Sequence, residues 1–476
     1  MSQKSPALFA IVAIYVLLGI LYARFTPPWQ APDEPAHYNY VRYVAQNLAL
    51  PELASGCYNQ AYLSQLTAQK FPPHLPVDSI CYEHYQPPLY YLLAAPVYAA
   101  TGGSLFALRL LSVGLGGLAL LMVFKTVRLF LPRTIFPAAT TAFVAFVPMH
   151  LTMLAAVNND SLAELLFISL TYLLLGWLLA RAQTGAPPPF IAGAALGLIL
   201  LTKVTVYTAL PLAAVTLFLA DRRPRPLLKN ALRVYLPALA MALPLYLRNA
   251  LVYGGLDILG LRRHDAVVVG QLRTAQKLAE QGWPGYLSDM FRTTFHSFWG
   301  QFGWMAVPMD GWVYLALNVA QWLAAAGLAL WLWRNPPRST ALRQALAVMA
   351  AALALAGSVF VGLNLSFVQF QGRYFFTALM PLGLFFSLGL FEAARRENAV
   401  AATGVPALRL GWTVVASAGG GGPGKWGLLI TGGALAALLV RRRLPDAASG
   451  WYLGGTLALL AALSGAGLWW FIIPNL

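Results

Sequence analysis

Long apolar stretches recur along the whole chain and are separated by short polar segments. An apolar run of about 20 residues is long enough to cross a bilayer as a helix. The pattern predicts spans at residues 6–25, 103–131, 135–156, 161–181, 227–253, 312–333, 341–363, 374–394 and 450–472. Shorter apolar runs lie at 190–220 and 426–440. We therefore expect an all-α polytopic membrane protein with roughly 11 to 13 transmembrane helices.

The composition agrees with this pattern. Hydrophobic residues make up 59% of the chain and charged residues 10%, against about a quarter charged in soluble domains. The net charge of +16 comes from Lys and Arg that cluster beside apolar runs. These basic blocks are Lys125, Arg128 and Arg133; Arg222, Arg223, Arg225, Lys229 and Arg233; Arg334, Arg338 and Arg343; and Arg441, Arg442 and Arg443. Short loops of this kind mark the cytoplasmic side and face anionic headgroups, so nucleic-acid binding is not expected.

The charges also predict an orientation. With the amino terminus inside, the basic blocks up to Arg343 fall inside, and residues 26–102 and 254–311 form two long outer loops. Their Trp, Tyr, Pro and His content is typical of interfacial segments, and we expect interfacial helices in the first loop. We divide the chain into a catalytic membrane module, 1–395, and a C-terminal loop and helices, 396–476, whose topology the charges leave open.

An acidic pair, Asp33 and Glu34, follows the first apolar run. Adjacent carboxylates at a membrane surface are costly to desolvate and need a reason. One interpretation is local, because an acidic residue before Pro35 caps the first turn of a helix. The other is chemical, because Asp33 and His37 are four residues apart, share a helix face and together form a general base. The spacing leaves both open.

Two further polar clusters are candidates for chemistry. Glu83 and His84 precede a Gln-Pro-Pro-Leu-Tyr-Tyr run that otherwise indicates an ordinary interfacial helix start. Asn158, Asn159 and Asp160 lie at an outer tip between two spans. This tip is either a helix cap or a set of hard oxygen ligands for Mg²⁺ or Mn²⁺, with Asp160 and Asn159 as the candidate metal ligands.

Lys203 and Arg373 are lone cations at apolar segments. Lys203 interrupts the apolar run at 190–220, and Arg373 opens a span on the outer face. Snorkelling to the interface explains either one alone. Together they provide a phosphate site, with Arg373 donating two parallel hydrogen bonds and Lys203 acting as a point charge.

Four motifs in order carry a family resemblance. They are Asp-Glu-Pro-Ala-His at 33–37, Gln-Pro-Pro-Leu-Tyr-Tyr at 86–91, Phe-Trp-Gly-Gln-Phe-Gly-Trp at 298–304 and Gln-Gly-Arg-Tyr at 371–374. With these motifs the chain resembles the GT-C superfamily of glycosyltransferases, which includes protein O-mannosyltransferases and lipid A aminoarabinose transferases. The similarity is greatest to a bacterial branch of polytopic membrane proteins that carry all four motifs.

The resemblance implies a GT-C-like fold and an inverting transfer of a sugar from a polyprenyl-phosphate donor to a glycan, lipid or protein acceptor. It implies Asp33 as the base that activates the acceptor, with Glu34 as the fallback and His37 beside them. Lys203 and Arg373 match the donor-phosphate site. The implied substrate-binding residues are His84, Tyr85, Gln86, Trp299, Gln301 and Gln371.

Two other function classes compete with an enzyme. A lipid or polysaccharide-precursor transporter (a flippase) also keeps charges in the membrane, usually near mid-bilayer and in related halves. Here the acidic residues gather in the outer loops, and no internal repeat is evident. A non-catalytic partner in a polysaccharide assembly complex is the third interpretation. For the enzyme, we expect a location in the cytoplasmic (inner) membrane with the active site on the extracytoplasmic face and membrane lipids around it.

Cys57 and Cys81 both fall in the first outer loop, 24 residues apart. On the outer side of a membrane a disulfide persists, and such a bridge stabilises by about 3 kcal/mol through chain entropy. The alternative is two unpaired thiols buried as small apolar side chains. Spacing alone leaves both possibilities open.

Overall fold

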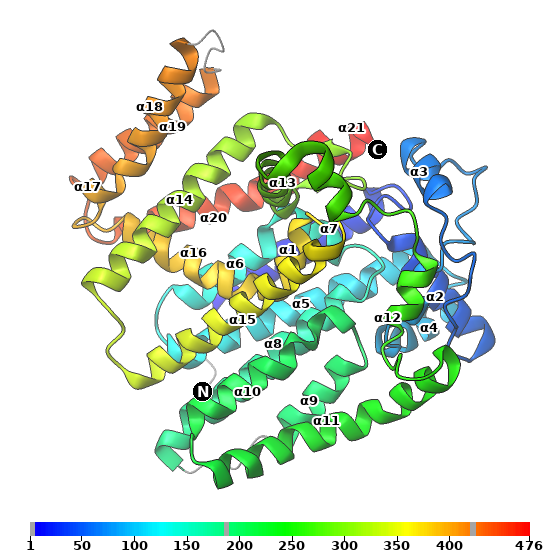
Figure 1. Ribbon diagram of the computed structural model, residues 1–476. Helices are drawn as coiled ribbons and strands as arrows, with labels where there is room; N and C mark the ends of the chain where they lie inside the picture. Colours follow the sequence, from blue (N-terminus) through cyan, green and yellow to red (C-terminus); the bar gives the residue numbers. More distant parts are fainter. Residues whose placement is uncertain (1–4, 185–189, 419–424) are drawn as a thin grey trace.

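A computed structural model describes residues 5–184, 190–418 and 425–476 of the chain. Helices that run side by side form one bundle, and a layer of short helices and loops covers the end of the bundle at the right of Figure 1. The described strands are two dipeptides, β1 (Gln301–Phe302) and β2 (Val307–Pro308), which pair antiparallel. The all-α prediction is therefore confirmed.

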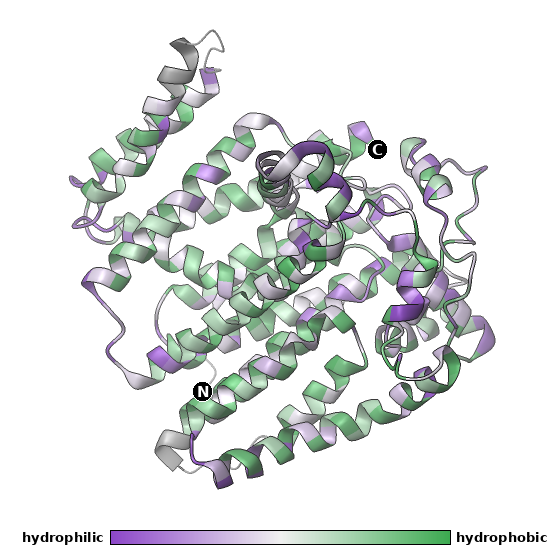
Figure 2. Cartoon of the chain, in the orientation of Figure 1, coloured by the Kyte–Doolittle hydropathy of each residue, from purple (hydrophilic) through white to green (hydrophobic). Residues whose placement is uncertain are grey.

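Eight helical segments in the described ranges are long and apolar enough to span a membrane. They are α1 (Pro6–Phe25), α5 (Leu105–Phe130), α8 (Asp160–Thr184), α11 (Pro224–Tyr253), α14 (Gly311–Arg334), α15 (Thr340–Ser366), η3 with α16 (Gly372–Ala378 and Leu379–Ala393), and α20 with η4 and α21 (Ala448–Gly467, Leu468–Ile472 and Ile473–Asn475). Figure 2 shows that apolar residues dominate these segments. The protein is thus an integral membrane protein.

A ninth span is broken. Helices α6 (Phe136–Phe146) and α7 (Pro148–Leu154) bend by 70° at Val147, where the sequence predicted one continuous span. Pro148 explains the break, because proline lacks a backbone N–H and pushes the preceding residue out of the helical region. Val147 accordingly has an extended backbone, with φ −70° and ψ 117°.

Shorter helices account for the gap between these spans and the 11 to 13 predicted. Helices of 10–17 residues are apolar but fall below the length of a full crossing. They are α4 (Leu89–Ala100), α9 (Phe190–Leu200) and η2 with α10 (Val204–Thr208 and Ala209–Ala220). Toward the C-terminus, α17 (Ala399–Ala402) leads into a hairpin of α18 (Gly404–Ala418) and α19 (Lys425–Arg441), which packs beside α14.

Glycines set the closest helix contacts. A Cβ on Gly327 of α14 would lie 1.9 Å from the carbonyl oxygen of Gly389 of α16, and a Cβ on Gly389 would lie 1.9 Å from that of Ala324. Only glycine fits at both positions, so the two backbones touch directly. Small residues allow this approach in membrane helices, where packing rather than the hydrophobic effect drives association.

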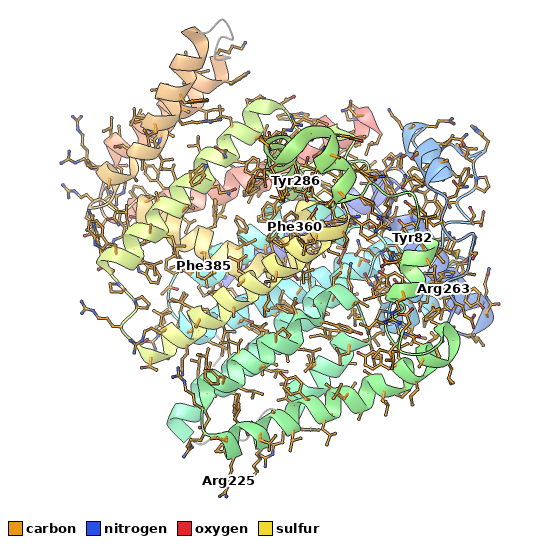
Figure 3. All side chains as sticks on the ribbon, viewed as in Figure 1. Tyr82, Arg225, Arg263, Tyr286, Phe360 and Phe385 are labelled. Carbon is orange, nitrogen blue, oxygen red and sulfur yellow. A yellow bond between two sulfur atoms is a disulfide. The ribbon has the colours of Figure 1, made fainter. Side chains whose placement is uncertain are left out.

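The outer layer consists of the two long loops expected from the charges. It contains α2 (Glu34–Asn47), α3 (Gln60–Ala68), η1 (Tyr82–Tyr85), α12 (Leu261–Val267) and α13 (Thr274–Trp299). Figure 3 places Tyr82 and Arg263 in this layer, and Arg225 of a basic block at the other end of the bundle. The interfacial helices and the separation of acidic loops from basic blocks thus agree with the sequence pattern.

A buried ion pair ties this layer to the bundle. Arg109 of α5 binds both carboxylate oxygens of Glu34, at 2.7 and 2.6 Å. Arg109 also donates to the carbonyl oxygens of Ala23, Thr26 and Pro27, where α1 ends. One guanidinium therefore fixes the exit of the first span and the start of α2 together.

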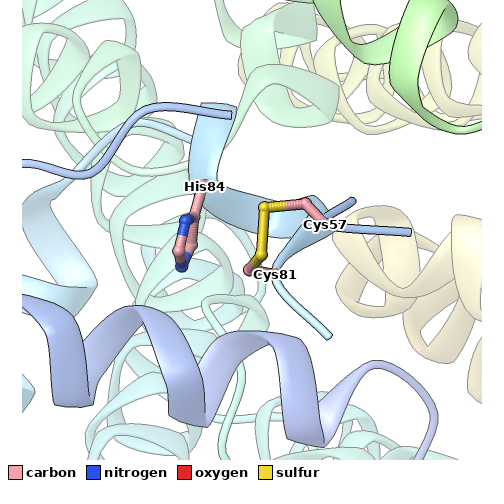
Figure 4. Close-up of side chains that lie close together, drawn as sticks. All are labelled: Cys57, Cys81 and His84. Carbon is pink, nitrogen blue, oxygen red and sulfur yellow. A yellow bond between two sulfur atoms is a disulfide. The ribbon is translucent and has the colours of Figure 1, made fainter. Parts of the chain in front are cut away.

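The two cysteines form a disulfide within the outer layer. Cys57 and Cys81 are bonded, with their Cα atoms 4.5 Å apart. The bridge lies against the imidazole of His84 (Figure 4), and these three residues are the one compact group of potential metal ligands in the described part of the chain. Because the sulfurs are bonded to each other, they are not available as thiolate ligands.

Candidate active site

Asp33 lies at the start of α2 in a left-handed conformation, with φ 66°. Aspartate tolerates this region better than most residues, since its short side chain can hydrogen-bond locally. Its side chain does not cap the helix. Instead, one carboxylate oxygen accepts from Tyr82 Oη at 2.6 Å and the other from Arg373 at 2.5 Å. The capping interpretation is therefore wrong for this side chain.

The electrostatics of Asp33 follow from these contacts. Burial alone would raise the pKa of Asp33, but the Arg373 guanidinium and the Tyr82 hydroxyl outweigh burial and lower the pKa to about 2. The carboxylate is therefore ionised and paired. A carboxylate in this state is a weak base, and it becomes a stronger base when Arg373 is drawn to another anion.

Glu34 has a different environment from its neighbour. Its side chain is fully buried. Besides both bonds from Arg109, its oxygens accept from the backbone N–H groups of Trp29 and Val157, at 3.1 and 3.2 Å. These four hydrogen bonds give Glu34 a structural role.

His37 is buried on α2 and pairs with Tyr91 rather than with the Asp33 carboxylate. Its Nδ1 lies 2.8 Å from Tyr91 Oη. Burial, with the charge of Lys203, lowers the pKa of His37 to about 3, so the ring is neutral. The shared-face prediction places His37 near Asp33, and the charge of Asp33 does act on the ring, but the described hydrogen bonds of the Asp33 carboxylate go to Tyr82 and Arg373.

Lys203 and Asp160 form the second ion pair of the site, at 2.6 Å. Lys203 stands at the break between α9 and η2, and Asp160 begins α8. Both groups, together with Arg373 and Asp33, are close enough to act on the titration of His37. The structure thus gathers Asp33, Arg373, Lys203 and Asp160 into one charged cluster from four separate parts of the sequence.

The proposed metal ligands only partly fit a cation. Asn159 donates its amide to the carbonyl oxygen of Thr202, and its side-chain oxygen is buried without a described partner. That oxygen and the second oxygen of Asp160 are the two hard donors available. The ammonium of Lys203 already neutralises Asp160. A lysine beside a carboxylate competes with a divalent cation for the same charge.

Glu83, which the sequence marked with His84 as a candidate for chemistry without a specific role, belongs to this cluster. Burial, with the negative charge of Asp33, raises the pKa of Glu83 to about 7. One of its carboxylate oxygens is shielded from solvent and has no described hydrogen-bond partner. The sequence signal was the Glu-His pair before the Pro-Pro turn, which an ordinary helix start does not explain.

The other predicted substrate-binding residues divide into two groups. Tyr85 and Gln86 are linked by a hydrogen bond of 3.0 Å. Both side chains lie close enough to Glu83 to interact with its carboxylate. His84 faces the other way, with its ring against Tyr40 and near the disulfide. Burial lowers the pKa of His84 to about 4.

Trp299 ends α13, and Gln301 lies in β1. Trp299 is buried in the apolar core against Phe143, and Gln301 donates to the carbonyl oxygen of Met305. Gln371 immediately precedes η3, where its carbonyl oxygen accepts from the backbone of Tyr374. The contacts of Trp299 and Gln301 position the loop around β1 and give no direct link to the charged cluster.

The fold has counterparts among solved structures. The chain matches ArnT from Cupriavidus metallidurans in the apo state at 17% identity and a TM-score of 0.51, over 97% of this chain and 76% of that one. ArnT bound to undecaprenyl phosphate matches at 16% identity and a TM-score of 0.48, over 97% and 77%. An oligosaccharyltransferase of Archaeoglobus fulgidus, in complex with Zn and sulfate, matches at 14% identity and a TM-score of 0.49, over 90% and 53%.

At these identities the likeness concerns the fold, and we rely on the apo ArnT match for it. That match confirms the GT-C-like architecture expected from the motifs. No curated protein sequence matches the chain significantly. One family model, described as a predicted membrane protein, matches residues 77–382, which is more than half of the chain. The chain therefore belongs to the DUF2142 family of predicted membrane proteins.

Proposed function

We propose that this protein is a glycosyltransferase that moves a sugar from a polyprenyl-phosphate donor to a hydroxyl acceptor, with inversion at the sugar carbon. The observation that carries the proposal is the pair formed by Asp33 and Arg373, flanked by Lys203 with Asp160. A carboxylate base and two phosphate-binding cations are the groups that such a transfer needs. The GT-C-like architecture and the four ordered motifs support the same reaction class.

In the proposed mechanism, the donor phosphate competes with Asp33 for Arg373. Release from the guanidinium raises the pKa of Asp33, which then accepts the proton of the acceptor hydroxyl. The acceptor oxygen bonds to the sugar carbon as the carbon–oxygen bond to phosphate breaks. The electron pair of that bond leaves on the polyprenyl phosphate, where Arg373 and Lys203 stabilise the charge. A single displacement of this kind inverts the carbon.

The ends of the helices support an extracytoplasmic site in the cytoplasmic membrane. Arg373 begins its span in the outer layer, and Arg225 and the basic loop that joins α14 and α15 lie at the other end of the bundle. Positive loops remain on the cytoplasmic side. A charged cluster at the ends of spans, rather than within them, favours chemistry over transport as the role of these residues.

We keep a divalent cation as a secondary proposal for Asp160 and Asn159. The free oxygen of Asn159 favours it, and the Asp160–Lys203 pair opposes it. In the metal-free form, Lys203 supplies the positive charge that a cation would otherwise bring to the donor phosphate. A chelator should lower the turnover of a metal-dependent enzyme and leave that of a metal-free enzyme unchanged.

Asp33→Asn keeps the shape and the tolerance for a left-handed backbone but removes the base. We expect a folded protein, destabilised less than Glu34→Gln because the Asp33–Arg373 pair is partly exposed and the Arg109–Glu34 pair is not, and a loss of turnover of at least ~100-fold, the usual scale for a general base. The matched contrast is Glu34→Gln, which leaves Arg109 buried without its counter-charge and destabilises by about 3–5 kcal/mol. Full activity of Asp33→Asn would transfer the base role to Glu83.

Arg373→Lys keeps the charge but loses the planar fork, so binding of polyprenyl phosphate should weaken about tenfold or more. Lys203→Gln should also weaken the binding of polyprenyl phosphate. The matched control is Arg338→Lys, in a basic loop at the other face, which should leave this affinity unchanged. Affinity is measured by titrating the purified protein with the lipid phosphate. Wild-type affinity in both Arg373→Lys and Arg373→Ala would place the phosphate site elsewhere.

Turnover should survive EDTA if Lys203 takes the place of a cation beside Asp160. The measurement is the rate before and after dialysis against the chelator, with readdition of Mg²⁺ or Mn²⁺. A loss that either metal restores would instead support Asp160 and Asn159 as ligands. Asp160→Asn distinguishes the metal-free enzyme from the metal-dependent one further. It removes the ion-pair partner of Lys203 in either case, but only in a metal-dependent enzyme does it abolish the recovery of activity by added metal.

Glu83→Gln should change the pH profile. Deprotonation of Glu83 near pH 7 places a negative charge beside Asp33 and makes Asp33 a stronger base, so wild-type activity should rise through this pH. The Glu83→Gln variant should lack this rise in activity.

The same group should also affect stability. Folding raises the pKa of Glu83 from 4.5 to about 7, so the folded state binds more protons than the unfolded state in this pH range. Wild-type stability should therefore fall as pH rises from 4.5 to 7, and that of Glu83→Gln should fall less.

A further inference from the structure

A polar cavity lies at the opposite end of α16 from Arg373. It has a volume of about 1090 Å³ and is lined by the end of α16 and the residues that follow it, the end of α19 and the start of α20. Arg373 and Arg395 stand at the two ends of the span Gly372–Ala393, so the cavity and the charged cluster face opposite sides of the membrane. The proposed transfer chemistry makes no use of this cavity.

The wall of the cavity contains a buried, unneutralised cation. Arg441 is fully buried, and its guanidinium donates to the carbonyl oxygens of Ala394, Leu444 and Asp446 and to the hydroxyl of Ser449. No carboxylate lies within salt-bridge distance of Arg441 in the described part of the chain. Carbonyl dipoles hold the guanidinium in place but leave its full charge.

The rim adds further positive charge. Arg396, Arg442 and Arg443 line the cavity and are solvent-exposed, and no ion pair of theirs is described. Glu397 also lines the cavity, but Arg395 already pairs with it at 3.0 Å. In all, five arginines line the cavity with two carboxylates, Glu397 and Asp446, and Glu392 behind the lining also pairs with Arg395. The remaining excess of positive charge favours an anion.

The position of the cavity identifies the source of that anion. Phe391 and Leu439 form an apolar part of its lining, and Leu439 and the adjacent Val440 on α19 are both exposed. An acyl chain can lie along this surface while a phosphate occupies the arginines. Basic pockets between membrane helices on the cytoplasmic side suit anionic lipid headgroups. A soluble phosphate would not use the apolar part of the lining.

We propose that this cavity is a binding site for the headgroup of an anionic membrane phospholipid, with Arg442, Arg443 and Arg396 contacting the phosphate and Arg441 holding the wall. The site is independent of the proposed sugar transfer. It makes the lipid a structural ligand that secures the junction of α16, α19 and α20.

The test compares two double variants of the full-length protein. Arg442→Gln/Arg443→Gln removes two exposed rim arginines, and Arg338→Gln/Arg343→Gln removes two exposed arginines from another basic block at the same face, outside the cavity. Each protein is purified in detergent, titrated with phosphatidylglycerol or phosphatidylcholine and read by native mass spectrometry. We expect wild type and the second variant to retain phosphatidylglycerol over phosphatidylcholine, and the rim variant to bind phosphatidylglycerol at least ~10-fold more weakly.

Three results would overturn the proposal. Equal losses of lipid binding in both double variants would indicate only an effect of general surface charge. A wild-type protein without a preference for phosphatidylglycerol would show that the cavity does not select an anionic lipid. Displacement of the lipid by millimolar inorganic phosphate would indicate a soluble ligand. Thermal unfolding of each variant without added lipid verifies that the rim variant is folded. Because no sugar donor enters the assay, failure here leaves the proposed transfer untouched, and the reverse also holds.

Discussion

The buried pair of Arg109 and Glu34 is the constraint on which the rest of the outer layer depends. One guanidinium satisfies both oxygens of Glu34 and three carbonyl groups at the end of α1. Its rigid, planar set of donors suits this task, and a lysine could not replace it. The interaction fixes the backbone immediately before α2. Asp33 is the residue at that junction, so the geometry of the candidate base follows from an ion pair in which Asp33 takes no part.

The charged cluster shows how a site of high charge can be stable at a membrane surface. Asp33 is paired with Arg373, and Asp160 with Lys203, so the four charges balance. A buried ion pair contributes little net stability, because desolvation offsets the attraction. In the proposed transfer, the donor phosphate exchanges for a carboxylate of such a pair. Glu83, with its pKa near neutrality, adds a group whose charge changes under physiological conditions.

The sequence predicted much of the fold because hydropathy reports directly on membrane spans. It also placed Asp33, Lys203, Arg373 and Asp160 as candidates, since isolated charges beside apolar runs are conspicuous. It could not show which charges meet. Asp33 and Arg373 are 340 residues apart in the chain, and local spacing instead suggested His37 as the partner.

The sequence also could not predict which of the acidic side chains are buried. Glu34 and Asp33 are adjacent and chemically alike, but only the packing of α5 against the first loop assigns them different roles. The raised pKa of Glu83 depends on desolvation, which no local pattern encodes. The 70° bend at Val147 was missed for a similar reason, because Pro148 in an apolar run is compatible with a continuous span as well as a broken one.

The direct backbone contact between α14 and α16 has a mechanical consequence. Where Gly327 meets Gly389, no side chains separate the helices, and there is nothing soft to compress or to change rotamer. The two helices therefore behave as one stiff beam through the thickness of the membrane. If such a rigid pair pivots within the membrane, the end near Arg373 and the end near Arg395 move in opposite directions. The two faces of the protein are thus connected by a rigid helix pair rather than by side chains that can rearrange.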